Sequence, residues 1–341
     1  MAENQNVKVC IGLSGGVDSS VAALLLKQQG YDVFALFMQN WHDASATLHG
    51  DCEWEEDRFV AELVARKIGI PFYFVDLSKE YRQRVVDYMF DEYEKGRTPN
   101  PDVLCNREIK FDAFLKCAKK LGADYVATGH YCRKVEGEAA DGQKISRILA
   151  GADPNKDQSY FLYRVPKEIL SKVEFPLGGL LKSEVRQLAA DFGLVFSDNE
   201  ESQDFCGGDV KSLIGMEQKK GEIVTLSGKV IGEHNGFWNY TVGMRKGLCV
   251  GGGIPYYVKA IDAVKNRVIV GFREEVLTTR FSIRAAVGNV KGECMVKIRS
   301  AGEPKGPVNV DGAEVTCVQA LSGVSPGQSA VFYRDEEIVG G

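Results

Sequence analysis

Three stretches of this 341-residue chain hold residues whose types and spacing could do chemistry. The first is SGGVDSS, from Ser14 to Ser20, which combines two glycines, three hydroxyls and a carboxylate. Glycine accepts positive φ and leaves room for a ligand, and N–H groups at a helix start attract anions. No lysine follows in the GxxxxGK[ST] pattern. The string therefore predicts a phosphate-binding turn of another kind, although Asp18 alone would also suit the first turn of any helix.

The second stretch is GRTPNPDVLCNREIKFD, which holds Asp102 and Cys105. Its glycine and prolines predict a loop over residues 98–104 and a helix that begins near Cys105 or Asn106. A helix N-terminus favours thiolate over thiol, so this cysteine is a candidate nucleophile and the aspartate a candidate acid or base. A helix cap beside an inert cysteine explains the same spacing equally well.

The third stretch is SQDFCGG, where Cys206 precedes Gly207 and Gly208. The two glycines would let this loop move. The two cysteines are 101 positions apart, so only folding can bring them together. From the residues alone, Cys206 is more readily interpreted as an ordinary loop cysteine.

The elements that must position these residues follow an alternating pattern. Apolar runs at 7–13, 32–37, 72–76 and 125–128 read as buried strands, and helical patterns lie between them at 17–29, 54–68, 79–95 and 105–121. This order predicts an α/β fold with a doubly wound, Rossmann-like parallel sheet. A helix is expected at 182–192, a hairpin at 222–233 about Ser227-Gly228, and a small β-barrel from Phe272 onward.

Composition limits the classes of protein to consider. The chain is 44% hydrophobic, and no apolar run reaches the roughly 20 residues of a membrane helix. Nine cysteines without C-x-x-C spacing and a polar N-terminus predict thiols in a cytoplasmic protein, and the chain ends abruptly at Gly340-Gly341. The net charge is −5, yet residues 207–341 hold 17 basic and 14 acidic side chains, which is compatible with a phosphate-binding face.

Several long motifs together resemble one family. SGGVDSS resembles the PP-loop of the ATP pyrophosphatases, which bind ATP and release pyrophosphate. With it, the chain from about residue 8 to 334 resembles the tRNA-specific 2-thiouridylases (MnmA/TrmU family) through NPDVLCNREIKF, ATGHY, DPNKDQSYFLYRV, FPLGGLLKSEVRQLA, SQDFCGG, YTVGMRKGL and SPGQSAVFY. The resemblance implies a catalytic domain at 1–206, a small central domain at 207–268 and a tRNA-binding β-barrel at 269–341.

The resemblance also implies an activity. Such an enzyme uses ATP, with Mg²⁺, to adenylate the carbon-2 oxygen of the wobble uridine, and a persulfide then supplies sulfur. Carried over by motif, Cys105 would be the nucleophile, Cys206 the persulfide carrier and Asp102 an acid or base. Asp18 would lie near the phosphates and help to hold Mg²⁺.

The resemblance extends to binding residues and partners. The ATP site would comprise Gly12, Leu13, Ser14, Gly15, Gly16, Val17, Asp18, Ser19, Met38 and Gly129. The tRNA contacts would comprise Asn100, Pro101, Asp102, His130, Lys156, Asp157, Gln158, Arg299, Ser300 and Gln328. The expected partners are the anticodon arm of tRNA and a persulfide-donating sulfur carrier or cysteine desulfurase, with no membrane.

The chain departs from the family pattern in places, and two other functions remain open. Gly207-Gly208-Asp209 replaces a longer apolar sequence, Met244 stands where glutamine is common, and Cys249 where glycine is common. A PP-loop enzyme that activates a small carboxylate or amide would show pyrophosphate exchange without RNA. A non-catalytic tRNA-binding adaptor would bind tRNA and release no pyrophosphate.

Overall fold

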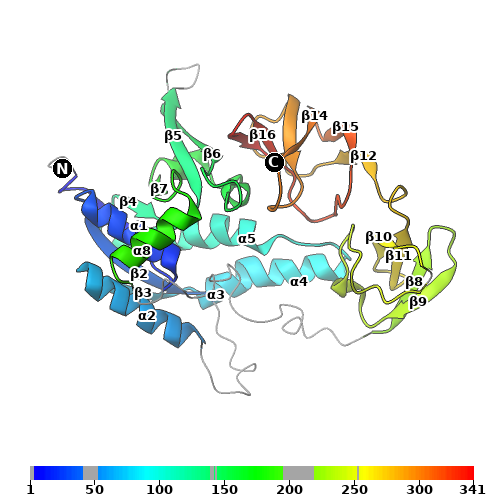
Figure 1. Ribbon diagram of the computed structural model, residues 1–341, viewed down its shortest axis with the longest axis horizontal. Helices are drawn as coiled ribbons and strands as arrows, with labels where there is room; N and C mark the ends of the chain where they lie inside the picture. Colours follow the sequence, from blue (N-terminus) through cyan, green and yellow to red (C-terminus); the bar gives the residue numbers. More distant parts are fainter. Residues whose placement is uncertain (1–3, 41–52, 139–141, 143, 195–218, 252) are drawn as a thin grey trace. The chain divides into compact units, whose positions relative to one another are not determined.

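The computed structural model describes residues 4–40, 53–138, 142, 144–194, 219–251 and 253–341, and the chain folds into two compact units (Figure 1). Unit 1 comprises Met1–Val85, Asp102–Gly207 and Glu336–Ile338. Unit 2 comprises Val86–Pro101, Gly208–Asp335 and Val339–Gly341.

Unit 1 is built on a five-stranded parallel sheet with the order β3-β2-β1-β4-β7. The strands are β1 (Lys8–Gly12), β2 (Asp32–Gln39), β3 (Phe72–Asp76), β4 (Tyr125–Ala127) and β7 (Val173–Glu174). Val9 lies opposite Val33 on one side and Tyr125 on the other, so β1 is central. The strand order reverses between β1 and β4, and open sheets bind ligands at the carboxyl ends of the strands beside such a reversal. The predicted doubly wound α/β fold is confirmed.

Helices cover both faces of this sheet. On one face, Val9, Ile11, Val33 and Ala35 share a buried core with residues of α1 (Val17–Gln28), α2 (Glu53–Ile68) and α8 (Lys182–Asp191). Side chains alternate across a strand, so Gly12 faces the other side, where the Phe114 ring lies 3.4 Å from the position of a Cβ. The inner strands β1, β2 and β4 are therefore buried on both faces, which explains their almost uninterrupted apolar sequences.

The helix that carries Asp102 and Cys105 begins earlier than the sequence predicts. It runs without a break through α5 (Pro101–Leu104), the π-helical η2 (Cys105–Phe114) and α6 (Leu115–Lys120). The prediction of a loop to residue 104 was wrong, because proline fits the first helical position, where no N–H donor is needed. Cys105 is thus the fifth helical residue rather than the first.

Further helices and a hairpin complete unit 1. The helices are α3 (Ser78–Tyr81), η1 (Arg82–Val86), η3 (Ser159–Leu162) and α7 (Lys167–Leu170), and η1 continues into α4 of unit 2. The hairpin pairs β5 (Cys132–Glu138) with β6 (Lys144–Ala150). Glu337 of β17 (Glu337–Gly340) lies opposite Leu149 of β6 and forms an ion pair with Arg147 at 3.1 Å. This hairpin was not predicted from the sequence.

The first part of unit 2 is a four-stranded sheet with the order β10-β11-β8-β9. Its elements are β8 (Gly221–Thr225), β9 (Val230–His234), β10 (Tyr257–Asp262) and β11 (Arg267–Gly271), with the short helices α4 (Asp87–Glu94) and η4 (Phe237–Asn239). Tyr93 of α4 packs against the core of this sheet, which includes Ile223, Val258 and Trp238. The hairpin predicted about Ser227-Gly228 is present as β8 and β9.

The second part of unit 2 consists of antiparallel strands in the order β12-β15-β14-β13-β16. They are β12 (Thr278–Ser282), β13 (Gly292–Lys297), β14 (Lys305–Asp311), β15 (Glu314–Leu321) and β16 (Val331–Arg334). Val296, Val308, Val315 and Phe332 form their buried core. The expected β-rich C-terminal region is therefore confirmed.

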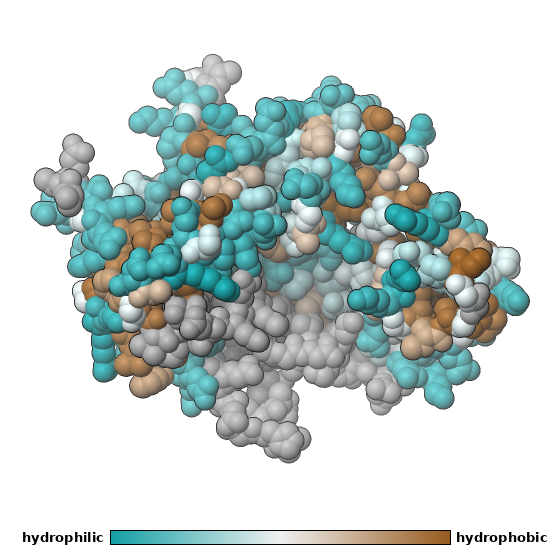
Figure 2. Space-filling model, in the orientation of Figure 1, coloured by the Kyte–Doolittle hydropathy of each residue, from teal (hydrophilic) through white to brown (hydrophobic). Residues whose placement is uncertain are grey.

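The edge of the unit 1 sheet exposes apolar side chains. Phe59 and Leu63 of α2 and Tyr73 and Phe74 of β3 are all exposed, and Figure 2 shows hydrophobic residues on this side of the unit. The Arg58 guanidinium lies 4.5 Å above the Phe74 ring. A cationic side chain beside an edge strand discourages pairing with another strand.

Candidate active site

Residues 14–20, which comprise the turn after β1 and the first turn of α1, are here called the phosphate loop. Gly15 has φ +84, and Gly16 is the N-cap of α1. The Ser19 hydroxyl accepts a hydrogen bond from Ser14 N–H at 3.2 Å and donates to the Gly16 carbonyl at 3.1 Å. The Ser20 hydroxyl also donates to Gly16, at 2.8 Å. The serines thus hold the loop in shape, and the first N–H groups of α1 are presented as donors for an anion.

Gly129 lies against this loop. It follows β4 at the carboxyl edge of the sheet, and a Cβ at this position would lie 2.9 Å from Asp18 C and from Ser19 N. Only glycine permits so close an approach of two backbone segments. The structure therefore brings Gly129 to the phosphate loop, where the resemblance placed the ATP site.

Met38 reaches the same edge of the sheet from β2. It is half-buried and lies opposite Val75 of β3, near the carboxyl end of its strand. Leu13, which leads into the phosphate loop, donates its N–H to Leu36 O of the same strand at 3.3 Å. Gly12 and Leu13 at the end of β1, Val17 at the start of α1, Met38 and Gly129 therefore all lie at one edge.

Asp18, in the first turn of α1, has two partners that were not predicted from the sequence. Its Oδ1 accepts a hydrogen bond from the Tyr131 hydroxyl at 2.6 Å and forms an ion pair with Lys182 Nζ at 2.6 Å. Lys182 is the first residue of α8, 164 positions further along the chain. The only sequence signal for it was its position in the motif FPLGGLLKSEVRQLA.

Asp102 and Cys105 lie one turn apart on the helix that starts at Pro101. The Cys105 side chain is buried, and the Asp102 carbonyl accepts a hydrogen bond from Asn106 Nδ2 at 3.0 Å. The thiol is not at the helix N-terminus, so the reason given for its activation from the sequence does not apply. Cys206 lies outside the described residues, as do Gly207, Gly208 and Asp209.

His130 is buried beside Gly129. Its Nδ1 lies 2.7 Å from Thr128 Oγ1, and its ring packs against Phe111 and Phe175. Burial, with a smaller effect from the Lys110 charge, holds the pKa of His130 well below its usual range, so the ring is neutral at pH 7. Its contact with tRNA stays a prediction.

Side chains of the segment Lys156-Asp157-Gln158 accept hydrogen bonds from backbone N–H groups of neighbouring segments. Asp157 Oδ1 accepts hydrogen bonds from Gly151 N at 3.1 Å and Ser159 N at 3.0 Å. Gln158 Oε1 accepts one from Tyr131 N at 3.0 Å. Gln158 therefore supports the residue whose hydroxyl contacts Asp18, and the predicted tRNA contacts of this segment remain to be tested.

In unit 2, the segment before the helix is tied to the loop between β15 and β16. Thr98 N–H donates to Pro326 O at 2.8 Å, and Gln328 Nε2 donates to Pro99 O at 3.0 Å. Gly327 has φ +93, and a Cβ there would lie 2.7 Å from Thr98 O. This loop therefore fixes the backbone that leads to Asn100 and Pro101.

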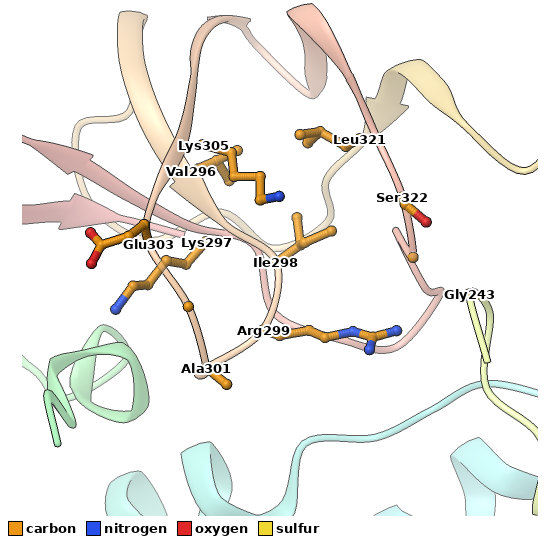
Figure 3. A pocket seen from close by; sticks show the side chains of 12 residues that line it. Gly243, Val296, Lys297, Ile298, Arg299, Ala301, Glu303, Lys305, Leu321 and Ser322 are labelled. Carbon is orange, nitrogen blue, oxygen red and sulfur yellow. The ribbon is translucent and has the colours of Figure 1, made fainter. Parts of the chain in front are cut away.

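Unit 2 also contains a cavity of about 290 Å³ beside the end of β13 (Figure 3). Lys297, Arg299 and Lys305 line it together with Glu303, and Figure 3 shows the Arg299 side chain extending toward Gly243. Arg299 Nη2 donates to Val242 O at 3.0 Å. Three cations against one carboxylate make this a cavity suited to an anion.

Several other cysteines are poor nucleophiles. Burial raises the pKa of Cys10 and of Cys132, and a neighbouring acidic group, Cys117 and Asp157 respectively, adds to each shift. Burial also raises the pKa of Cys294 and Cys317. These four thiols therefore stay protonated at neutral pH.

The described part of the chain contains neither a candidate metal cluster nor a candidate membrane helix. No group of three or more His, Cys, Asp or Glu side chains there is arranged to hold a metal ion. Asp18 offers a single carboxylate at the phosphate loop, which suits Mg²⁺ held mainly by substrate phosphates. No helix within the same residues is long and apolar enough to cross a bilayer.

Three family models match successive parts of the chain. One described as "tRNA methyl transferase HUP domain" matches residues 7–207. One described as "tRNA methyl transferase PRC-barrel domain" matches residues 213–272, and one described as "Aminomethyltransferase beta-barrel domain" matches residues 273–341.

Relatives match over most or all of their length. The chain is 44% identical to a protein of Flavobacterium johnsoniae named tRNA-specific 2-thiouridylase MnmA, with 98% of each chain covered. It is 50% identical to a protein of the same name from Christiangramia forsetii over 77% of this chain and 76% of that one. A third protein of that name, from Streptococcus thermophilus, is 43% identical over 100% of this chain and 96% of its own.

Proposed function

The chain belongs to the tRNA-specific 2-thiouridylase (MnmA) family, and we propose on that premise how it converts a tRNA uridine to 2-thiouridine. The chain adenylates the carbon-2 oxygen of the wobble uridine with ATP and then replaces that oxygen by sulfur from a cysteine persulfide. The products are 2-thiouridine, AMP and pyrophosphate. The observation that carries this proposal is the match along the whole chain to relatives named for this activity.

Adenylation requires ATP with its α-phosphorus open to attack. The phosphate loop supports such a site, because its N–H groups and serine hydroxyls are donors at the carboxyl edge of a parallel sheet. The uridine carbon-2 oxygen attacks the α-phosphorus, pyrophosphate leaves, and the N3 proton is lost. Asp102 would take that proton and later return it. Asp18 would help to hold Mg²⁺, which supplies positive charge against the phosphates.

Sulfur transfer then requires two thiols. The Cys105 thiolate attacks the inner sulfur of a persulfide on Cys206, and the two cysteines form a disulfide. The outer sulfur leaves with the electron pair of the broken S–S bond and bonds to carbon 2, and AMP leaves with the carbon–oxygen bond pair. An external thiol reduces the disulfide, and a persulfide-donating protein, either a sulfur carrier or a cysteine desulfurase, reloads Cys206.

Binding of the anticodon arm would involve residues from several of the motifs. A wobble base is already single-stranded, so extruding it costs little. Asn100, Pro101 and Asp102 would contact that base. Arg299 supports a phosphate contact because it is exposed and lines the cationic cavity. Ser300, Gln328, His130 and the 156–158 segment remain proposed tRNA contacts.

The proposal is tested by mass spectrometry of tRNA nucleosides. Unmodified tRNA is incubated with the protein, ATP, Mg²⁺, a persulfide source and a thiol reductant. We expect 2-thiouridine with the wild type and none with Cys105→Ser or Cys206→Ser, while both variants still bind ATP. Cys249→Ser is the matched control, because Cys249 is an exposed cysteine that we assign no role. Full thiolation by both variants would sink the proposed sulfur transfer.

A further inference from the structure

The phosphate loop lacks the lysine that other nucleotide-binding loops carry within their own sequence, and Lys182 of α8 supplies one from a distant part of the chain. We propose that Lys182 binds the β- or γ-phosphate of ATP and that Asp18 holds it in place while the site is empty. This proposal rests on the ATP site of the proposed function and adds a residue to it.

The start of α8 is fixed at the loop independently of the Lys182 ammonium. Lys182 N–H donates to Asp153 Oδ2 at 2.9 Å, and Asp153 is itself buried. Leu181 N–H donates to the Glu184 carboxylate at 2.7 Å. The α8 helix also packs against α1, which carries Asp18. The backbone thus delivers the side chain to the loop, and only the ammonium needs to change partner.

The contacts of the Lys182 ammonium are exchangeable. Its Nζ lies 2.6 Å from Asp18 Oδ1, and the same oxygen accepts the Tyr131 hydroxyl. The ammonium also lies 5.7 Å from the Tyr131 ring centroid, and the lysine side chain is only 13% exposed. A phosphate that enters the loop offers this largely buried cation more negative charge than one carboxylate does.

The exchange has a consequence for Asp18. The Asp18 Oδ1 is paired with the Lys182 ammonium, whereas coordination of Mg²⁺ needs that oxygen's lone pairs. When Lys182 moves to phosphate, this oxygen keeps its Tyr131 contact and gains room for the cation. ATP and Mg²⁺ would therefore bind cooperatively, and Lys182 would link the two.

The test compares ATP with AMP, which lacks the β- and γ-phosphates. Calorimetric titration of the full chain is carried out with each nucleotide and Mg²⁺ but without tRNA. Lys182→Ala should weaken ATP binding by about 10–100-fold, because hydrogen bonds to charged groups are strong, and should change AMP binding by less than about threefold. Lys182→Arg should recover part of the ATP affinity. If Lys182→Ala does not fold, Lys182→Met keeps most of the apolar stem and answers the same question.

Lys134→Ala is the matched control. Lys134 Nζ lies 2.7 Å from Glu174 Oε1, and its side chain is 11% exposed, so it forms a similar ion pair within unit 1. Lys134→Ala should lower the unfolding temperature about as much as Lys182→Ala and leave both nucleotide affinities unchanged. If Lys182→Ala weakens the binding of ATP and AMP equally, or changes the binding of neither nucleotide, Lys182 only joins α8 to α1 and the proposal is wrong.

The outcome separates this proposal from the proposed function. A wild type that binds ATP in a Lys182-dependent way but forms no 2-thiouridine would leave Lys182 assigned and overturn the thiolation mechanism. If the wild type thiolates tRNA and Lys182→Ala binds ATP normally, the thiolation mechanism would stand and the role of Lys182 would be overturned.

Discussion

The phosphate loop, which holds two glycines, and the segment 97–101, which holds two prolines, both lead into a helix, but they are held in place differently. The serine contacts of the phosphate loop join residues at most five positions apart. The contacts that hold Thr98 and Pro99 come from Ser325 and Gln328, 227 and 229 positions away. A local motif can fix its own shape, whereas the second segment depends on a completed β-barrel.

The difference predicts two kinds of failure. Damage within the phosphate loop should remove the ATP-dependent step directly. Damage to the barrel loop at 325–329 should leave ATP chemistry intact and disturb only the step that needs Asn100 and Pro101. Substitutions at Gly129, Gly327 and Gln328 test this separation, in order of decreasing expected effect, and a fourth, smaller effect concerns the stability of unit 1.

Gly129→Ala should have the largest effect. Its Cβ would lie 2.9 Å from the Asp18 and Ser19 backbone, so the first turn of α1 must shift. A shift of about 1 Å at a reacting centre costs on the order of 100-fold in rate, and we expect that loss in tRNA-dependent pyrophosphate release. Gly179→Ala is the control, since a Cβ there meets nothing within 4 Å. An unchanged rate in Gly129→Ala would remove Gly129 from the ATP site.

Gly327→Ala should reduce thiolation about tenfold, because a non-glycine residue at this φ is strained and its Cβ would press on Thr98 O. ATP affinity should not change. Gly292→Ala shares the backbone strain, at φ +90, without the contact. Single-turnover thiolation and ATP titration on both variants make the comparison. Equal losses in the two variants would mean that strain alone is responsible and that the barrel loop does not position the segment.

Gln328→Ala removes one hydrogen bond to Pro99 O, worth about 1 kcal/mol, and should lower the thiolation rate about fivefold. Gln328→Glu keeps the size but has no N–H to donate, so it should behave like the alanine variant. A Gln328→Glu enzyme with wild-type kcat and a raised KM for tRNA would instead mean that Gln328 acts by touching tRNA.

The smallest expected effect is on how the free energy of unfolding of unit 1 depends on pH, through the buried His130. His130 has a pKa held well below its usual range by burial, so the unfolded chain binds more protons than the folded chain below about pH 6.5. Stability of unit 1 should therefore fall by about 0.7 kcal/mol between pH 7 and pH 6. Hydrogen exchange of β1 and β4 amides measures this, and His130→Asn should flatten the change. If His130→Asn leaves the change in stability between pH 7 and pH 6 unaltered, that change arises from another titratable group.

The sequence predicted the parts of the fold that local patterns control. SGGVDSS after an apolar strand led to the phosphate loop, and Ser227-Gly228 led to the β8–β9 hairpin. The start of the helix that carries Asp102 and Cys105 was missed because Pro101 was interpreted as a helix breaker, although proline is favoured at the first helical position. The β5–β6 hairpin was missed although its strands pair over seven residues.

The candidate site was only partly predictable for a physical reason. Lys182 and Tyr131 reach Asp18 through tertiary packing of α8 and β4 against α1, and no spacing in the sequence encodes a contact across 164 residues. The support of Pro99 by Gln328 is equally non-local. Gly129 was placed by resemblance alone, and its reason, the lack of room for a Cβ, is visible only in three dimensions.

The raised pKa values of Cys10 and Cys132 matter for an enzyme that handles reactive sulfur. The chain has nine cysteines, so a persulfide donor could transfer sulfur to a cysteine that takes no part in the reaction. Because a protonated, sequestered thiol neither attacks a persulfide nor accepts an alkylating reagent, the fold itself suppresses these side reactions. The fidelity of sulfur delivery would then depend partly on the burial of these other thiols in the core.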